Sequence, residues 1–272
     1  WSVHVGTFEV RNGRARLSPT ELSPLSGGWK WNAKLAALDF SPEGVRSPLP
    51  QRVEVTDLAL AWNPSGAKVK PPPFALLKSA EIALVPDRWR ESWWVDTLKL
   101  AGLNLDFTPE NGPWFDKAVA EPPKPPSKEP QPWQRVVFGE LSVTDATFAM
   151  AMQLAQRMEA SARFDITTKE SKQRLQIQDV HVRVPKMANL PVLGLESIET
   201  VMSLPEMWSQ RRVESLQVRG GQVLAGDALM TLFSGRAAMV EEKAGAVSAR
   251  WTAGKVDVAG LGVTILNIAP GL

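Results

Sequence analysis

The chain has 272 residues, of which 44% are hydrophobic and 22% are charged, and its 31 basic and 29 acidic side chains leave a net charge of +2. This composition provides enough apolar residues for a large core, and no run of 18 apolar residues predicts a membrane span. The balanced charge gives no electrostatic reason to expect nucleic acid as a partner. Cysteine is absent, which excludes disulfides, thiol nucleophiles and thiolate metal sites.

The first predicted strand, residues 1–17, changes its apolar parity halfway. Phe8 and Val10 share one face, and after Asn12 the apolar positions resume one residue out of phase at Ala15. Because side chains alternate along a strand, such a slip turns every later side chain to the opposite face. A β-bulge at the pivot residue would cancel this reversal and keep the apolar residues on one side.

Six further segments repeat this pattern, with starts separated by 45, 45, 43, 34, 41 and 40 residues. Each pivot is a residue type that enters the left-handed αL region at low cost. The seven pivots are Asn12, Asp57, Gly102, Asp145, Asp179, Gly220 and Gly260. The spacing predicts an internal repeat of about 40 residues, and in the segment 98–107 we expect the bulge at Gly102.

Alternating residues 33–40 and 79–85 predict partner strands between these copies. Pro86 and Trp89 precede the copy at 98, and Pro205 and Trp208 precede the copy at 216, an offset of 119 positions. Proline suits the first turn of a helix, where its missing N–H is not needed. Each repeat is therefore expected to contain a strand, a corner with a buried Trp and a long kinked strand.

Three segments are less regular. Residues 116–132 (DKAVAEPPKPPSKEPQP) predict an exposed Pro-rich excursion within a single repeat-built domain, 1–272. Residues 149–160 fit both helix and strand periods, and strand is favoured, with 160–166 as the neighbouring strand. Residues 185–194 predict a short helix or a cap.

No catalytic or metal-binding constellation is present in the sequence. His4 and His181 are the only histidines, and parity places His181 on the polar side of its strand. The glycine pairs at 27–28 and 220–221 have no following GK pattern, so they do not predict a phosphate loop. The sequence therefore predicts no enzyme and no cofactor.

The candidate site is the apolar face of the pivot strands. Its predicted lining is Leu98, Leu100, Leu105, Phe107, Leu141, Val143, Val182 and Leu216. One interpretation is that this face fills a closed sandwich or barrel core. The other is that regularly placed bulges curl the sheet into an open gutter whose inner face holds acyl chains.

Residues 102–114 (GLNLDFTPENGPW), the Pro-rich segment and residues 136–150 (VVFGELSVTDATFAM) together resemble the AsmA-like proteins of Gram-negative envelopes. This resemblance implies a mainly β fold: an elongated, curved antiparallel sheet of ~40-residue repeats, a β-taco or groove, with a few short helices. It also implies a periplasmic location and an inner-membrane anchor outside this chain. The chain begins at Trp1, so we expect a processed or excised piece.

Two functional hypotheses follow from this reading. In the first, the chain is a β-groove protein that binds or transfers phospholipid or another acyl-chain lipid during envelope maintenance. In the second, it is a non-enzymatic scaffold of a membrane-associated complex, whose Trp-rich edges (Trp29, Trp31, Trp93 and Trp94) contact other envelope proteins. A carbohydrate-binding protein with an exposed Trp platform is a third interpretation.

Overall fold

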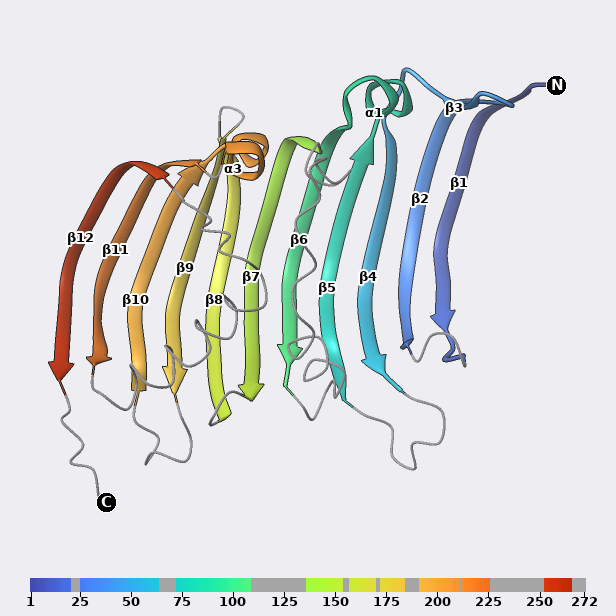
Figure 1. The fold of residues 1–272 in the computed structure, drawn as a ribbon. Helices are drawn as coiled ribbons and strands as arrows, with labels where there is room; N and C mark the ends of the chain where they lie inside the picture. Colours follow the sequence, from blue (N-terminus) through green and yellow to red (C-terminus); the bar gives the residue numbers. More distant parts are fainter. Residues whose placement is uncertain are drawn as a thin grey trace, which may run out of the picture.

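The computed structural model describes residues 1–20, 25–63, 72–108, 136–153, 157–169, 172–183, 191–210, 212–225 and 252–265. These residues are mainly strand and form one long, open, curved sheet with two short helices (Figure 1). The strands are β1 (Val3–Leu17), β2 (Leu25–Ser41), β3 (Gly44–Arg46), β4 (Gln51–Trp62), β5 (Pro73–Leu84), β6 (Trp94–Phe107), β7 (Val137–Gln153), β8 (Arg157–Lys169), β9 (Lys172–Arg183), β10 (Pro191–Met202), β11 (Arg212–Ala225) and β12 (Thr252–Ile265). The helices are α1 (Pro86–Ser92) and α3 (Leu204–Gln210).

The sheet follows chain order, β1-β2-β4-β5-β6-β7-β8-β9-β10-β11-β12, with β3 paired only to β2. The expected antiparallel arrangement holds except at two places, where β6 pairs with β7 and β11 pairs with β12 in parallel. These parallel pairs divide the sheet into two modules of five neighbouring strands, β1-β2-β4-β5-β6 and β7-β8-β9-β10-β11, with β12 beginning the same pattern again. All seven pivot strands consequently run in the same direction.

Every predicted pivot adopts the left-handed conformation, with φ between 50° and 71°. Four of the seven are Asn or Asp, which tolerate αL because their short polar side chains bond locally. Asn12 and Asp145 are the pivots of the first strand of each module. The Asn12 N–H donates a hydrogen bond to Asn32 Oδ1 on the next strand, and the Asp145 N–H donates to Asp165 Oδ1 in the same way, both at 2.9 Å. The predicted conformation is therefore confirmed at all seven positions.

Bulges occur at only some of these pivots. Register shifts with one extra residue on the pivot strand appear at Asn12, Asp57, Asp145 and Asp179, against β2 or β8. The expected bulge at Gly102 is wrong, because β6 pairs one-to-one with both β5 and β7 there. The pairings beside Gly220 and Gly260 are likewise continuous.

The partner strands explain this difference. Along β8, and along β2 from Leu25 to Leu35, the apolar positions keep one parity, so a neighbouring pivot strand needs an extra residue to stay in phase. Along β5 the apolar positions change from Ala75 and Leu77 to Ala80 and Ile82, and β10 changes from Leu195 to Ile198 in the same way. Because these partners slip together with the pivot strand, no register shift is needed.

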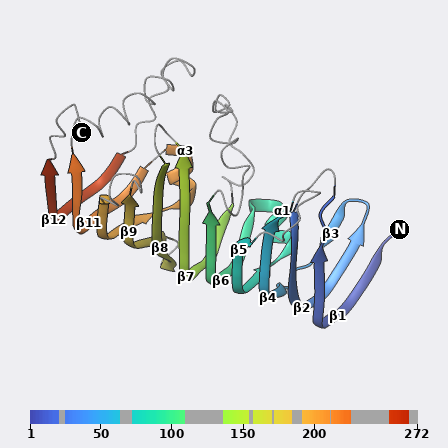
Figure 2. The same cartoon turned by 90° about the horizontal axis from the view of Figure 1, so that it is seen from below.

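The strands are bent near their middle, so the sheet forms a trough with α1 and α3 on its inner side (Figure 2). A core cluster of Leu141, Val143 and Ala146 lies on this face. Residues from both sides of the β6 pivot, Leu100 and Leu103, pack against the cluster. The parity slip thus leaves the apolar residues of both strand halves on one face.

The two modules also share polar positions. Gln51 and Gln173 lie six residues before the pivots Asp57 and Asp179, and both are buried, with 8% and 2% of their surface exposed. Gln51 accepts a hydrogen bond from the Ala36 N–H at 2.8 Å and donates to the Ala36 carbonyl at 2.9 Å. The Gln51 amide thus takes the place of a backbone hydrogen-bond partner for Ala36, next to Ala37, whose φ is positive at 49°.

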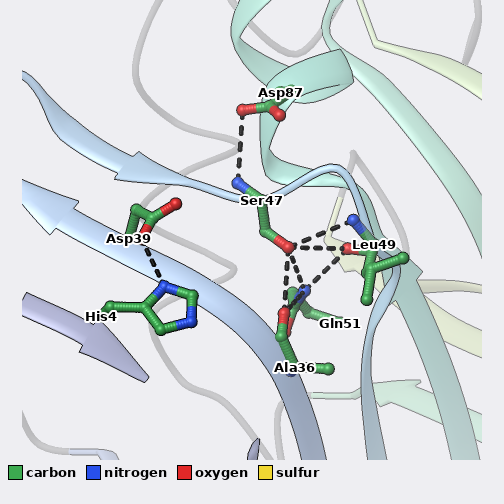
Figure 3. A network of polar contacts seen from close by, with 7 residues as sticks. All are labelled: His4, Ala36, Asp39, Ser47, Leu49, Gln51 and Asp87. Carbon is green, nitrogen blue, oxygen red and sulfur yellow. Dashed lines mark hydrogen bonds and ion pairs between the residues drawn. The ribbon is translucent and has the colours of Figure 1, made fainter. Parts of the chain in front are cut away.

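The same network holds α1 in place (Figure 3). Ser47 is fully buried and accepts a hydrogen bond from Gln51 Nε2 at 3.0 Å. The Ser47 N–H donates to Asp87 Oδ1 in the first turn of α1, at 3.3 Å, and Asp87 N–H donates back to the Ser47 carbonyl at 3.4 Å. In the second module, Gln173 Oε1 accepts from the Leu204 N–H at 3.1 Å and holds the start of α3.

The structure also tests the predicted helices and the three irregular segments. A short helix with a proline in its first turn and a kinked strand after it are confirmed in both modules. Trp89 is half-buried rather than buried, and the burial of Trp208 lies outside what the structure describes. The strand interpretation of 149–160 is confirmed for 149–153, which end β7, but 157–160 already belong to the neighbouring strand β8, and 154–156 lie outside the described residues. The predicted Pro-rich excursion at 116–132 lies outside the described residues. Most of 185–194 does so too, and its described end belongs to β10.

Candidate functional site

The eight predicted lining residues lie on the apolar face in rows that cross the strands, because directly paired residues share a face. Leu98 pairs with Leu141, and Leu100 pairs with Val143. The Leu100 row is the longest, and it runs from β4 to β12 through Val55, Ala80, Leu100, Val143, Ile166, Leu175, Thr200, Leu216 and Val256. The structure thus brings six of the eight together on β6 and β7.

The other two predicted residues join the face at a distance from this centre. Val182 belongs to the row that starts at Phe107 and passes through Met150 and Ala160. Leu216 lies on β11, in the Leu100 row. Both are therefore on the predicted face, but Val182 lies two strands and Leu216 four strands away from β7, which carries the core cluster.

An aromatic group marks one end of β6. The ring of Phe107 stacks on Phe74 at 6.2 Å between centroids and meets Phe148 edge-on at 5.7 Å. Such offset and edge-on contacts are favourable arrangements for aromatic rings. Phe107 therefore packs within the sheet face as part of a small cluster.

Burial along this face is high in the core cluster and low on the edge strand β12. Leu141 and Val143 are 7% and 4% exposed, whereas Val256 and Val258 on β12 are 59% and 50% exposed. Ile82, which pairs with Leu98, is 36% exposed. Among the described residues no second sheet covers this face, and the two helices lie at one end of the strands (Figure 1).

The opposite face carries charged side chains, and several of them form cross-strand pairs. Lys30 and Asp57 are 2.8 Å apart, Arg219 and Asp257 are 2.6 Å apart, and Arg163 pairs with Asp179. A hydrogen bond from Arg174 at 2.6 Å, with a second from Gln176, holds the pKa of Glu199 below its ordinary value of 4.5. The two faces therefore differ sharply in polarity.

Sequence reasoning missed the buried amides of Gln51 and Gln173. The signal was present, because residues 51–57 (QRVEVTD) and 173–179 (QRLQIQD) share Gln, Arg and Asp at the same spacing. A search based on apolar alternation disregards polar positions, so these residues did not stand out. Their role depends on which backbone groups the fold leaves unpaired.

The Trp residues of the scaffold hypothesis take part in the sheet and its corner. Trp29 and Trp31 are half-buried and lie in the interior of β2. Trp93 ends α1 in the αL conformation with φ 53°, and its N–H donates to the Trp89 carbonyl. Its own carbonyl accepts from the Val137 N–H at 3.1 Å and so holds the start of β7.

Within the described ranges no helix is long and apolar enough to cross a membrane. In the same residues no group of three or more His, Asp or Glu is placed to hold a metal ion. The fold and this face define a module-built, single-sheet β protein with one apolar and one charged face. No family model, curated protein or solved structure matches the chain.

Proposed function

We propose that the chain is a β-groove protein that binds or transfers phospholipid or another acyl-chain lipid on the inner face of its sheet. The observation that carries this proposal is the Leu100 row, which is apolar from Val55 to Val256 except at the buried Thr200 and whose last member, Val256, is 59% exposed. Soluble monomers rarely expose large contiguous apolar surfaces unless these bind a ligand or partner.

The dimensions of the sheet are consistent with this role. Eleven strands lie side by side, and at about 4.8 Å between neighbours the trough is about 48 Å long. An acyl chain reaches about 15 Å, half the thickness of a bilayer core. The trough is thus long enough for several chains in succession, and the resemblance to AsmA-like proteins supports a periplasmic, inner-membrane-anchored setting.

A scaffold role is the second candidate, and the sheet edges favour it. In the described part of the chain, the outer edges of β1 and β12 carry no neighbouring strand, and both strands are long. Unpaired edges of this length are natural sites for strand addition by a partner. A stable protein partner without bound lipid would favour this role.

The test uses adjacent residues that point to opposite faces. Val258 on the apolar face and Ala259 on the charged face are both exposed, so a lysine at either site adds the same charge without removing a core contact. We expect V258K to weaken binding of a fluorescent phospholipid at least about tenfold, because a buried ammonium in an apolar groove is strongly unfavourable.

Ala259→Lys is the matched control and should bind lipid like the unmodified chain. Native mass spectrometry of the purified protein supplies a second readout, in which co-purifying phospholipid is expected. If the unmodified chain binds no lipid by either method, or if V258K binds as well as A259K, the groove function is wrong.

A further inference from the structure

The charged face contains a hollow of about 860 Å³ at one end of the first module. We call it the basic hollow and define it by Arg14, Arg16, Ser26, Gly28, Lys30 and Asp57, which belong to β1, β2 and β4. Arg14 pairs with Lys30 and Arg16 with Gly28, while the intervening Ala15 pairs with Trp29 on the apolar side. The hollow therefore opens on the face opposite the lipid-binding surface proposed above.

Two guanidinium groups in the basic hollow have no partner among the described residues. Arg14 and Arg16 are exposed and two residues apart, which places their Cα atoms about 6.7 Å from each other on one face. Lys30 is paired with Asp57 at 2.8 Å, so these two charges cancel. The defining side chains consequently carry a net charge of +2, from three cations and one carboxylate.

Ser26 adds an unsatisfied donor. Its Oγ is buried and has no hydrogen-bond partner within the described part of the chain. A buried hydroxyl without a partner is destabilising, and an oxygen-bearing ligand in the hollow would satisfy it. Gly28 leaves the floor open, because a Cβ there would meet only the Ala15 carbonyl oxygen, at 3.5 Å.

The second module shows that the fold does not require these features. The two modules can be aligned by their pivots. Aligning Asn12 with Asp145 places β1-β2 on β7-β8 with an offset of 133 residues, and aligning Asp57 with Asp179 places β4 on β9 with an offset of 122 residues. At these offsets Arg14 corresponds to Thr147 and Arg16 to Ala149. The same backbone is thus built without either arginine.

The second module also fills the corresponding space with paired charges. Ser26 corresponds to Glu159 and Ala61 to Arg183, and this Glu–Arg pair is joined at 2.8 Å. The Lys30–Asp57 pair corresponds to Arg163–Asp179. The equivalent region is therefore neutral, so the excess positive charge is particular to the first module.

We propose that the basic hollow is a binding site for a phosphate-class oxyanion. Two guanidinium groups on one face suit the fork-like, bidentate recognition of phosphate, and the Ser26 hydroxyl supplies a further donor. The ligand is either a free phosphate compound or the phosphate of a lipid headgroup. The site stands apart from the proposed lipid groove, so each proposal can fail without the other.

The experiment uses the full chain at low ionic strength and measures binding by titration calorimetry. Inorganic phosphate and glycerol 3-phosphate are the soluble probes, and vesicles of phosphatidylglycerol, compared with phosphatidylcholine vesicles, are the membrane probe. We expect Arg14→Thr combined with Arg16→Ala, the residues of the second module, to weaken binding at least about tenfold. Binding of the soluble probes identifies a free phosphate compound, and binding of the anionic vesicles alone identifies a headgroup.

Arg52→Thr combined with Arg212→Ala is the charge-matched control, because both arginines are exposed and lie outside the hollow. Gly28→Leu keeps every charge and fills the hollow, and it should weaken binding as well. Circular dichroism verifies that each variant is folded. The proposal is overturned if no probe binds the unmodified chain, or if the control pair weakens binding as much as R14T/R16A while Gly28→Leu leaves it unchanged.

Discussion

The backbone strain of each pivot strand is concentrated at its single αL residue. At Gly102 φ is +64°, and a Cβ there would lie 2.9 Å from the Cβ of Lys78 on β5. At the Asp and Asn pivots the side chain is tolerated, and at Asp57 and Asp179 it is used in a cross-strand ion pair. The identity of the pivot residue thus reflects what stands opposite it.

We predict that Gly102→Ala lowers the free energy of unfolding by about 2 kcal/mol, from αL strain and the contact with Lys78. Thermal and urea denaturation followed by circular dichroism measure this effect. Gly28→Ala is the control, because a Cβ at Gly28 has only an ordinary contact. Equal effects of the two substitutions would refute the strain argument.

The buried amide of Gln51 gives a second prediction at this scale. Gln51→Ala removes its hydrogen bonds to Ala36, Ser47 and Leu49 and leaves buried backbone groups unpaired. We expect a loss of about 2 kcal/mol in the free energy of unfolding. Gln178→Ala, at an exposed position of β9, should change stability by less than about 0.5 kcal/mol.

At the scale of elements, the sheet keeps the apolar side chains of paired strands on one face in two different ways. A pivot strand beside β2 or β8 takes one extra residue, and a pivot strand beside β5 or β10 has a partner that slips with it. Both solutions keep apolar side chains on the inner face. Charged pairs then link neighbouring strands across the other face, as Arg174 on β9 does with Glu199 on β10.

The Glu199 pair predicts a pH dependence. The folded-state pKa of Glu199 lies below its ordinary value of 4.5, so the pair stabilises the fold fully above pH 4.5, and this contribution is lost as the pH falls below it. We expect Glu199→Gln to lose less stability than the unmodified chain on acidification through this range. Urea midpoints at a series of pH values measure the difference, and parallel curves for both proteins would contradict it.

At the scale of the whole molecule, the parallel β6–β7 pairing joins the two modules. The core cluster lies at this junction, and Val143 at its centre is 4% exposed. The apolar contacts of the cluster come from β6, β7 and β8 together with Leu204 at the start of α3. Stability of one module is therefore expected to depend on the other.

We predict that Val143→Ala lowers the free energy of unfolding by about 2 kcal/mol and reduces amide hydrogen-exchange protection on both sides of the junction. Val258→Ala removes the same atoms from a site that is 50% exposed near the sheet end, and it should cost less than about 0.5 kcal/mol. Loss of protection confined to β7 and β8 in Val143→Ala would show that the modules are independent.

Much of the fold could be predicted from local signals. Apolar alternation identified most strands, the Asn, Asp and Gly pivots identified seven αL positions but not those of Ala37 and Trp93, and the two Pro–Trp segments identified the helices. The bulge at Gly102 was predicted wrongly. A bulge is needed there only if the neighbouring strand β5 does not change its apolar parity at the same level. A register is a property of two strands, and one strand's pattern specifies only half of it.

The sequence by itself therefore determined the strand faces, the pivots and the apolar lining residues, because side-chain period and φ preference are local properties of the chain. The tertiary structure alone decided the parallel pairs between modules, the positions of the bulges and the burial of Gln51 and Gln173. It also assembled the basic hollow from β1, β2 and β4. These features depend on which distant segments become neighbours, and pairing between strands fixes that choice.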